Sequence, residues 1–123
     1  MKGIAILGST GSIGRSTLEI IRMHPGRFRV VSLAAGNNIA LLKRQIEEFK
    51  PAYVSVLAEK AALRLKRSLI RPPELGFGIE GARIAASCAG AHMAVSAISG
   101  AAGLLPTLAA IMAGKDIALA NKE

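Results

Sequence analysis

Aromatic side chains and carboxylates are both scarce in this sequence. There is no Trp, one Tyr and three Phe, so the stacked aromatic platforms that bind single-stranded nucleic acid are nearly missing. Asp and Glu number eight against sixteen Lys and Arg, which leaves a net charge of +8. We therefore interpret the basic side chains as a solvated face that attracts anionic ligands, and keep a nucleic-acid partner as the weakest alternative.

Cysteine and long apolar spans are also limited. Cys88 is the single cysteine, which excludes an internal disulfide and favours a cytoplasmic protein in which this residue is small and buried. The N-terminal Met1 leads into a strand pattern within three residues, so no signal peptide is expected. No charged residue occurs between Arg83 and Lys115, but glycines and a proline divide this stretch into short pieces. We expect it to be core and expect no membrane span.

Short apolar runs alternate with amphipathic segments along the whole chain. The expected strands are residues 4–7, 30–34, 53–57, 75–77, 93–98 and 117–120. The expected helices run from the end of the first strand to His24, from Asn38 to Pro51, and over 58–70, 79–89 and 103–114. In the first two helices the predicted buried faces are Ile13, Thr17, Ile20 and Ile21, and Ile39, Leu42, Ile46 and Phe49. The alternation predicts a three-layer α/β domain over residues 1–123, with a doubly wound parallel sheet.

Residues 8–14 read Gly-Ser-Thr-Gly-Ser-Ile-Gly, between the first predicted strand and the first predicted helix. Glycines permit a tight turn and a close approach of a pyrophosphate, and the helix start supplies free N–H groups. The spacing is a variant of the dinucleotide-binding fingerprint, and Ser12 is expected to cap the helix. A P-loop fits less well, because Ser9 stands where its first glycine would be and Arg15 replaces its lysine. A glycine turn without a ligand remains the alternative.

The end of the second predicted strand contains no carboxylate. NAD sites usually place Asp or Glu there to bind the ribose hydroxyls, whereas this chain has Ala35, Gly36, Asn37 and Asn38. Amides and backbone N–H groups at a helix start can bind a 2′-phosphate, so the pattern favours NADP. An equally open interpretation is that Gly36 and Asn37 form only a turn and Asn38 only a cap.

Polar residues also follow the last predicted strand. Asn121, Lys122 and Glu123 come directly after it, and polar groups at the carboxyl end of a parallel strand lie beside the ligand crevice. Lys122 would offer a cation to a substrate phosphate or polarised oxygen, and Asn121 an amide to a nicotinamide or ribose. A charged surface tail is the alternative.

As a set, these motifs resemble one family over essentially the whole chain. The matching segments are residues 6–14, 28–31, 35–38, 100–108 and 119–123. They are similar to the N-terminal, Rossmann-like NADPH-binding domain of 1-deoxy-D-xylulose 5-phosphate reductoisomerase. The resemblance implies an enzyme of non-mevalonate isoprenoid biosynthesis. It would isomerise 1-deoxy-D-xylulose 5-phosphate and reduce it to 2-C-methyl-D-erythritol 4-phosphate, with NADPH and Mg²⁺ or Mn²⁺.

The resemblance also implies roles for individual residues. Those on the pyrophosphate side would be Thr10, Gly11, Ser12 and Ile13, and those at the 2′-phosphate would be Gly36, Asn37 and Asn38. Asn121 and Glu123 would contact the cofactor nearer the nicotinamide, and Lys122 would reach the phosphorylated sugar substrate. Asn37 departs from the family, which often has Lys or Arg there, so one charge contact would be lost.

The family's metal ligands and catalytic segments are expected after residue 123, and the scattered carboxylates of this chain do not replace them. The resemblance therefore implies an isolated domain that binds NADPH without turnover, whereas the full-length enzyme is expected to be a homodimer. A generic NAD(P)-binding dehydrogenase module or a nucleotide-binding regulator is the alternative function.

Overall fold

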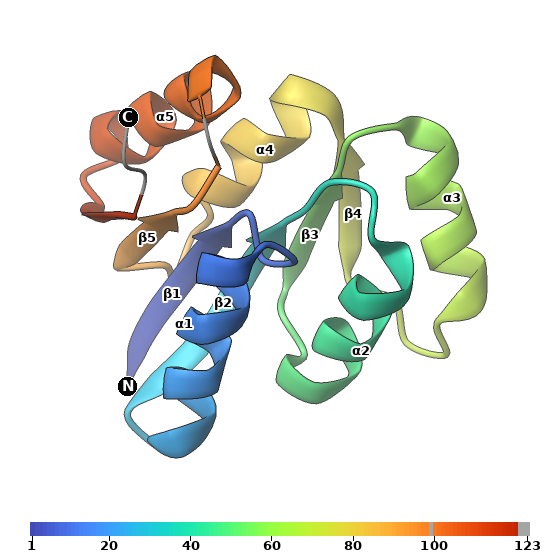
Figure 1. Ribbon diagram of the computed structural model, residues 1–123, viewed down its shortest axis with the longest axis horizontal. Helices are drawn as coiled ribbons and strands as arrows, with labels where there is room; N and C mark the ends of the chain where they lie inside the picture. Colours follow the sequence, from blue (N-terminus) through green and yellow to red (C-terminus); the bar gives the residue numbers. More distant parts are fainter. Residues whose placement is uncertain (99, 121–123) are drawn as a thin grey trace.

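The computed structural model describes residues 1–98 and 100–120. Its centre is one sheet of six parallel strands, in the order β4-β3-β2-β1-β5-β6 (Figure 1). The strands are β1 (Lys2–Leu7), β2 (Phe28–Ala34), β3 (Tyr53–Val56), β4 (Glu74–Phe77), β5 (Met93–Ser96) and β6 (Asp116–Leu119). All six predicted strands are confirmed, with small differences at their ends.

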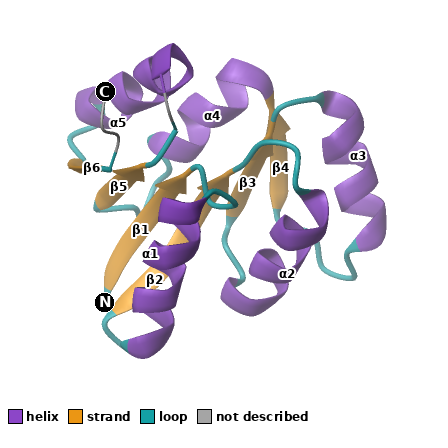
Figure 2. Cartoon of the chain, in the orientation of Figure 1, coloured by secondary structure: helices purple, strands orange, loops and turns teal. Residues whose placement is uncertain are grey.

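Helices cover both faces of this sheet (Figure 2). They are α1 (Ser12–Met23), α2 (Ile39–Phe49), α3 (Glu59–Ser68), α4 (Gly78–Ala86) and α5 (Leu104–Met112), the last preceded by a 3₁₀ turn at Gly100–Gly103. The first three helices pack on one face, and α4 and α5 on the other. The predicted doubly wound, three-layer architecture is therefore confirmed.

The strand order reverses once along the chain. From β1 the chain moves outward through β2 and β3 to β4, and α4 then returns it across the sheet to β5 on the other side of β1. In sheets of this kind, the crevice at the carboxyl ends of the strands beside the reversal binds ligands. The crevice in this molecule lies beyond Leu7 of β1 and Ser96 of β5.

The two faces of the sheet carry different side chains. Large aliphatic residues such as Ile6 and Leu42 fill the layer under α1 to α3. The layer under α4 and α5 is built mostly from alanines, and a Cβ added at Gly81 of α4 would lie 3.0 Å from the carbonyl carbon of Gly76. Because real Cβ atoms avoid such distances, only glycine lets α4 approach the sheet this closely.

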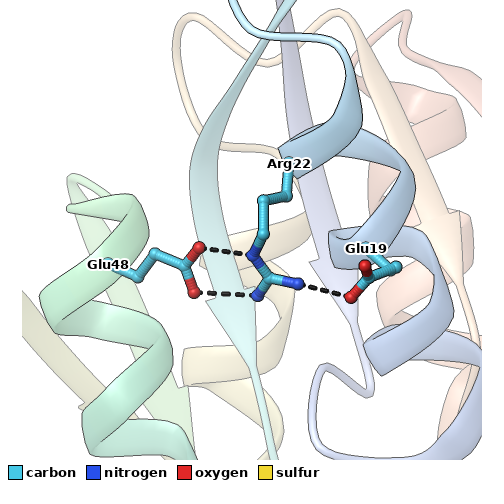
Figure 3. A network of polar contacts seen from close by, with 3 residues as sticks. All are labelled: Glu19, Arg22 and Glu48. Atoms are coloured by element: carbon cyan, nitrogen blue, oxygen red, sulfur yellow. Dashed lines mark hydrogen bonds and ion pairs between the residues drawn. The ribbon is translucent and has the colours of Figure 1, made fainter.

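An ion pair joins α1 and α2 near their C-terminal ends (Figure 3). The Arg22 guanidinium donates to both carboxylate oxygens of Glu48, at 2.5 and 2.8 Å, and to Glu19 at 2.5 Å. It also lies over the Phe49 ring, 5.5 Å from the ring centroid. The hydrogen bonds from Arg22 hold the pKa of Glu48 below its ordinary value. This exposed cluster links the two helices at the end of the sheet opposite the crevice.

The predicted buried face of α1 was wrong in part. The buried residues are Gly14, Leu18 and Ile21, whereas Ile20 is 55% exposed and Ile13 is also exposed. The physical reason is the close contact of Gly14 with the preceding loop, which turns the side of the helix with Gly14 inward. The predicted face of α2 is confirmed, with Leu42 and Ile46 buried and its other two residues packed against them.

The two predicted helix caps had different outcomes. Ser12 is the first residue of α1 and not its cap, because the extended residue before the helix is Gly11, which has no side chain to accept a hydrogen bond from the first turn. Asn38 does cap α2, and its Oδ1 accepts a hydrogen bond from the Leu41 N–H at 3.2 Å. None of the helices in the described part of the chain is both long enough and apolar enough to cross a bilayer.

Candidate functional site

The turn after β1 is held tightly against the end of β2. The N–H groups of Gly8 and Ser9 both donate to the Ala34 carbonyl oxygen, at 2.7 and 3.1 Å. The Gly11 N–H returns to the Gly8 carbonyl at 3.3 Å. Gly8 has a φ of +94°, and a Cβ there would lie 2.9 Å from the Ala97 carbonyl oxygen, so both conformation and space require glycine. The predicted glycine loop is therefore a compact turn with a defined backbone.

Helix α1 begins directly at this turn. The first hydrogen bond of helical type runs from the Arg15 N–H to the Gly11 carbonyl, at 2.9 Å. Ser12, Ile13 and Gly14 come before that bond, so helix geometry leaves their N–H groups without a carbonyl partner inside the helix. The positive end of the helix dipole adds to these donors. The turn with its helix start therefore has the backbone features that favour an anion, and the roles of Thr10, Gly11, Ser12 and Ile13 in binding one stay predictions.

A cavity of about 560 Å³ adjoins the turn at the carboxyl ends of β1, β2 and β3. On the strand side it is lined by Gly8, Ala34, Ala35, Gly36, Ser55, Val56 and Leu57. The other wall is formed by α4, the segment leading into α5 and the first turn of α5, with Gly78, Ile79, Ala82, Ile98, Ala102, Leu105 and Pro106. The lining is mainly apolar, and the volume of the cavity is in the range of pockets that bind small organic ligands.

The segment after β2 lies at the edge of this cavity. Gly36 lines it, and the Ala35 N–H is bonded to the Ser55 carbonyl at 2.9 Å. Asn37 and Asn38 are exposed at the start of α2, and the Asn37 carbonyl accepts from the Ile39 N–H at 2.9 Å. Since the glycine turn bonds to Ala34 just before this segment, the structure brings two of the predicted cofactor segments together.

The third predicted segment, Asn121, Lys122 and Glu123, lies outside the described residues. The described chain ends at Ala120, whose N–H donates to the Ser96 carbonyl at 3.0 Å. The roles of these three residues therefore stay predictions.

Several residues around the site were missed by the sequence analysis. Gln45 of α2 is buried and donates from Nε2 to the Ser9 carbonyl at 2.9 Å. Ser96 and Thr107 share a hydrogen bond of 2.8 Å between the end of β5 and the first turn of α5. Ile79 is 64% exposed although it lines the cavity. The sequence contains no local signal for these contacts, because each joins elements that are distant along the chain.

The remaining candidate side chains have structural roles. His92 accepts at Nδ1 from the Gly3 N–H at 2.9 Å and ties the start of β5 to β1. Cys88 is half-buried against the alanine-rich layer, and burial raises the pKa of its thiol, which disfavours the nucleophilic thiolate. Within residues 1–98 and 100–120 no three His, Cys, Asp or Glu side chains are grouped so that they could hold a metal ion.

A parallel doubly wound sheet with a glycine turn and a helix start at its strand reversal defines a dinucleotide-binding domain of the Rossmann type. The sequence model of 1-deoxy-D-xylulose 5-phosphate reductoisomerase matches residues 4–123, and the chain belongs to this family.

Individual relatives agree with this assignment. The chain is 59% identical to the 1-deoxy-D-xylulose 5-phosphate reductoisomerase of Citrifermentans bemidjiense and 60% identical to that of Geotalea uraniireducens. Each alignment covers 100% of this chain and 32% of the relative, so the chain spans about a third of the length of these curated relatives.

Solved structures show the same fold. A crystal structure of DOX-P reductoisomerase in complex with NADPH, fosmidomycin and magnesium superimposes with a TM-score of 0.94 at 40% identity, over 100% of this chain and 31% of that one. The reductoisomerase from Zymomonas mobilis in complex with NADPH has a TM-score of 0.91 at 36% identity, over 98% of this chain and 32% of the other. Both of these structures are complexes with NADPH.

Proposed function

We propose that residues 1–123 form the NADPH-binding domain of a 1-deoxy-D-xylulose 5-phosphate reductoisomerase. That enzyme isomerises its substrate and reduces it to 2-C-methyl-D-erythritol 4-phosphate, and NADPH supplies the hydride. The observation that carries the proposal is the glycine turn held against the end of β2 beside the 560 Å³ cavity. The turn supplies N–H donors for phosphates, and the adjoining cavity supplies an apolar space for a flat ring.

The pyrophosphate of the cofactor is assigned to the turn. Ser12 and Ile13 carry N–H groups that helix geometry leaves without a carbonyl partner inside the helix, and Thr10 and Gly11 come directly before them. Gly11 also has room for close approach of a ligand. An added Cβ at Gly11 would meet only the Gly8 carbonyl oxygen within 4 Å, at 3.6 Å. The fit of this turn to a phosphate therefore rests on backbone donors and open space.

The adenosine 2′-phosphate is assigned to Gly36, Asn37 and Asn38. These residues lie at the N-terminus of α2, where the helix dipole favours an anion, and no carboxylate occurs between Phe28 and Ile39 to repel one. Asn38 already uses its Oδ1 as a helix cap, which leaves its amide nitrogen as the donor toward a ligand.

The other parts of the reaction are assigned to the whole protein. A phosphorylated sugar substrate reached by Lys122, cofactor contacts of Asn121 and Glu123, a Mg²⁺ or Mn²⁺ ion and a homodimer in the cytoplasm are all proposed from the family. One solved relative contains magnesium, and the described residues of this chain offer no metal cluster. We therefore propose that these 123 residues alone bind NADPH without turning over the substrate.

A titration of the 123-residue chain with NADPH and with NADH tests the assignment. NADPH should bind more tightly, and adding 1-deoxy-D-xylulose 5-phosphate and Mn²⁺ should cause no steady oxidation of NADPH. Equal affinity for the two cofactors, or tighter NADH binding, would favour a generic NAD(P)-binding module. Steady oxidation would overturn the proposal that the chain lacks turnover.

Substitutions at Asn37 test the 2′-phosphate site directly, because this side chain is exposed. Asn37→Asp should weaken NADPH binding several-fold by charge repulsion and leave NADH binding unchanged. Asn37→Lys is the matched opposite and should strengthen NADPH binding. Equal changes for both cofactors would place the 2′-phosphate elsewhere.

A further inference from the structure

Gln45 is a polar residue at a position of α2 that otherwise suits an apolar one. The buried residues of this helix are Leu42, Gln45 and Ile46, and Gln45 is 5% exposed. Its Nε2 donates to the Ser9 carbonyl at 2.9 Å, but its Oε1 is buried without a hydrogen-bond partner in the described part of the chain. A buried amide with one unpaired oxygen costs free energy, so packing alone does not favour glutamine over leucine or methionine here.

The hydrogen bond from Gln45 controls the direction of one peptide group in the glycine turn. Ser9 is fully buried, and its N–H is already held by the Ala34 carbonyl at 3.1 Å. The peptide that joins Ser9 to Thr10 is planar and trans, so its C=O and N–H point in opposite directions. Because Gln45 holds the C=O toward α2, the Thr10 N–H points away from α2.

We propose that Gln45 is a positioning residue of the cofactor site. Its carboxamide keeps the Ser9–Thr10 peptide in the orientation that offers an N–H group to the pyrophosphate. Without this bond the peptide is free to rotate, and a carbonyl oxygen turned outward would repel the phosphates. The inference rests on the proposed binding of NADPH at Thr10, Gly11, Ser12 and Ile13, and adds a residue that does not touch the ligand.

Gln45→Met tests this role with a side chain of similar length that has no donor. The variant also removes the unpaired Oε1, so its urea unfolding midpoint should stay close to that of the parent chain. NADPH should bind about tenfold more weakly, which corresponds to about 1.4 kcal/mol. Gln45→Asn is the second variant, because its amide is one methylene too short to reach Ser9, and it should show the same loss.

Ser32→Ala is the matched control. Ser32 Oγ donates to the Ala85 carbonyl at 2.6 Å, is buried, and lies on the opposite face of the sheet. Removing the Ser32 hydroxyl also leaves a buried carbonyl, that of Ala85, without a side-chain donor, but Ser32 makes no hydrogen bond to the glycine turn. This variant should therefore keep the NADPH affinity of the parent chain, whatever its loss of stability.

Adenosine 2′-phosphate, which has no pyrophosphate, separates positioning from a general structural effect. Gln45→Met should bind this ligand as the parent chain does, and only NADPH binding should fall. If the parent chain binds NADPH, two results would overturn the role of Gln45 and leave the proposed function intact. One is an equal loss of affinity for both ligands in Gln45→Met, and the other is a Gln45→Met variant that binds NADPH as tightly as the parent chain. Failure of the parent chain to bind NADPH at all would overturn the proposed function itself.

Discussion

Substitution of Gly14 by alanine should disrupt the glycine turn. A Cβ at this position would lie 2.6 Å from Ser9 Cα and 2.8 Å from the Ser9 carbonyl carbon, and would overlap the Gly8 carbonyl oxygen. Carbon atoms in contact lie about 3.5–4.0 Å apart, so the helix start and the turn must separate by about 1 Å. All three neighbours are backbone atoms and no rotamer change relieves the overlap. We expect a loss of about 2–4 kcal/mol in the free energy of unfolding, at or above the usual cost of overpacking.

Gly11→Ala is the matched control within the same turn. An added Cβ would lie 3.6 Å from the Gly8 carbonyl oxygen, and the φ of −77° at Gly11 suits any residue. Alanine restricts the unfolded chain, but glycine is the better helix cap, and these opposed effects leave the free energy of unfolding within about 0.5 kcal/mol of the parent. Because the pyrophosphate is assigned beside Gly11, the added methyl should weaken NADPH binding without unfolding the chain.

Urea unfolding followed by circular dichroism, together with NADPH titration, measures both variants. For a chain of this size the slope is about 1–3 kcal/mol per molar urea, so a loss of about 3 kcal/mol lowers the midpoint by roughly 1–3 M. The Gly14 variant should lose stability and affinity, and the Gly11 variant affinity alone. A Gly14 variant with the parental midpoint, or equal destabilisation at the two positions, would refute the steric argument.

Substitutions at three further positions have defined outcomes. Asn38→Ala removes the cap of α2 and should lower the free energy of unfolding by about 1 kcal/mol in urea titrations, whereas Asn38→Asp should retain it. Because Arg22 lowers the pKa of Glu48 from 4.5, their ion pair stabilises the fold above that pH, and its contribution is lost as the pH falls through the lowered pKa. Glu48→Gln should therefore flatten the dependence of the urea midpoint on pH below 4.5, and an unchanged slope would count against the pair. Gly81→Ala should destabilise the chain by about 1–3 kcal/mol, because the new Cβ would overlap Ser55 Oγ, and a parental thermal midpoint would contradict this packing.

The fold class followed from the sequence because each strand and helix is marked by local residues. Apolar runs of strand length, a proline after α2 and glycines at turns bound these elements well, and all six strands formed where expected. Alternation of strands and helices requires parallel crossovers but is compatible with many strand orders. The order β4-β3-β2-β1-β5-β6, and with it the position of the crevice, depends on long-range packing that no local pattern records.

Local periodicity does not give the buried face of an element where its backbone departs from ideal geometry or makes a close contact. Strand β2 has an irregular register against β1 between Ile4 and Ala5, so Val30 and Leu33 pack on the same face although they are three residues apart. In α1 the contact of Gly14 with the turn outweighs the apolar residues and leaves Ile20 exposed. The spacing of apolar residues in the sequence does not reveal backbone contacts at a glycine or an irregular strand register.

The candidate site, like the fold, was predictable from the sequence only in part. The turn and the segment after β2 were predicted because glycines, asparagines and missing carboxylates are informative within a few residues. The far wall of the cavity was missed, since Ile79, Leu105 and Pro106 resemble ordinary residues of α4 and α5 until the fold brings them over the strand ends. Gln45 was missed for a related reason, because its partner Ser9 is distant along the chain.

The glycine turn is held from three directions by separate elements. Ala34 of β2 accepts from its N–H groups, Gln45 of α2 donates to its carbonyl, and Gly14 of α1 packs against its backbone. A turn fixed in this way loses little conformational freedom when a ligand binds, so more of the interaction energy remains as affinity. Loss of the Gln45 anchor should therefore weaken binding more than folding, because Ala34 and Gly14 still hold the turn in place. Loss of the Gly14 contact should weaken both, since that contact also sets how α1 packs on the sheet.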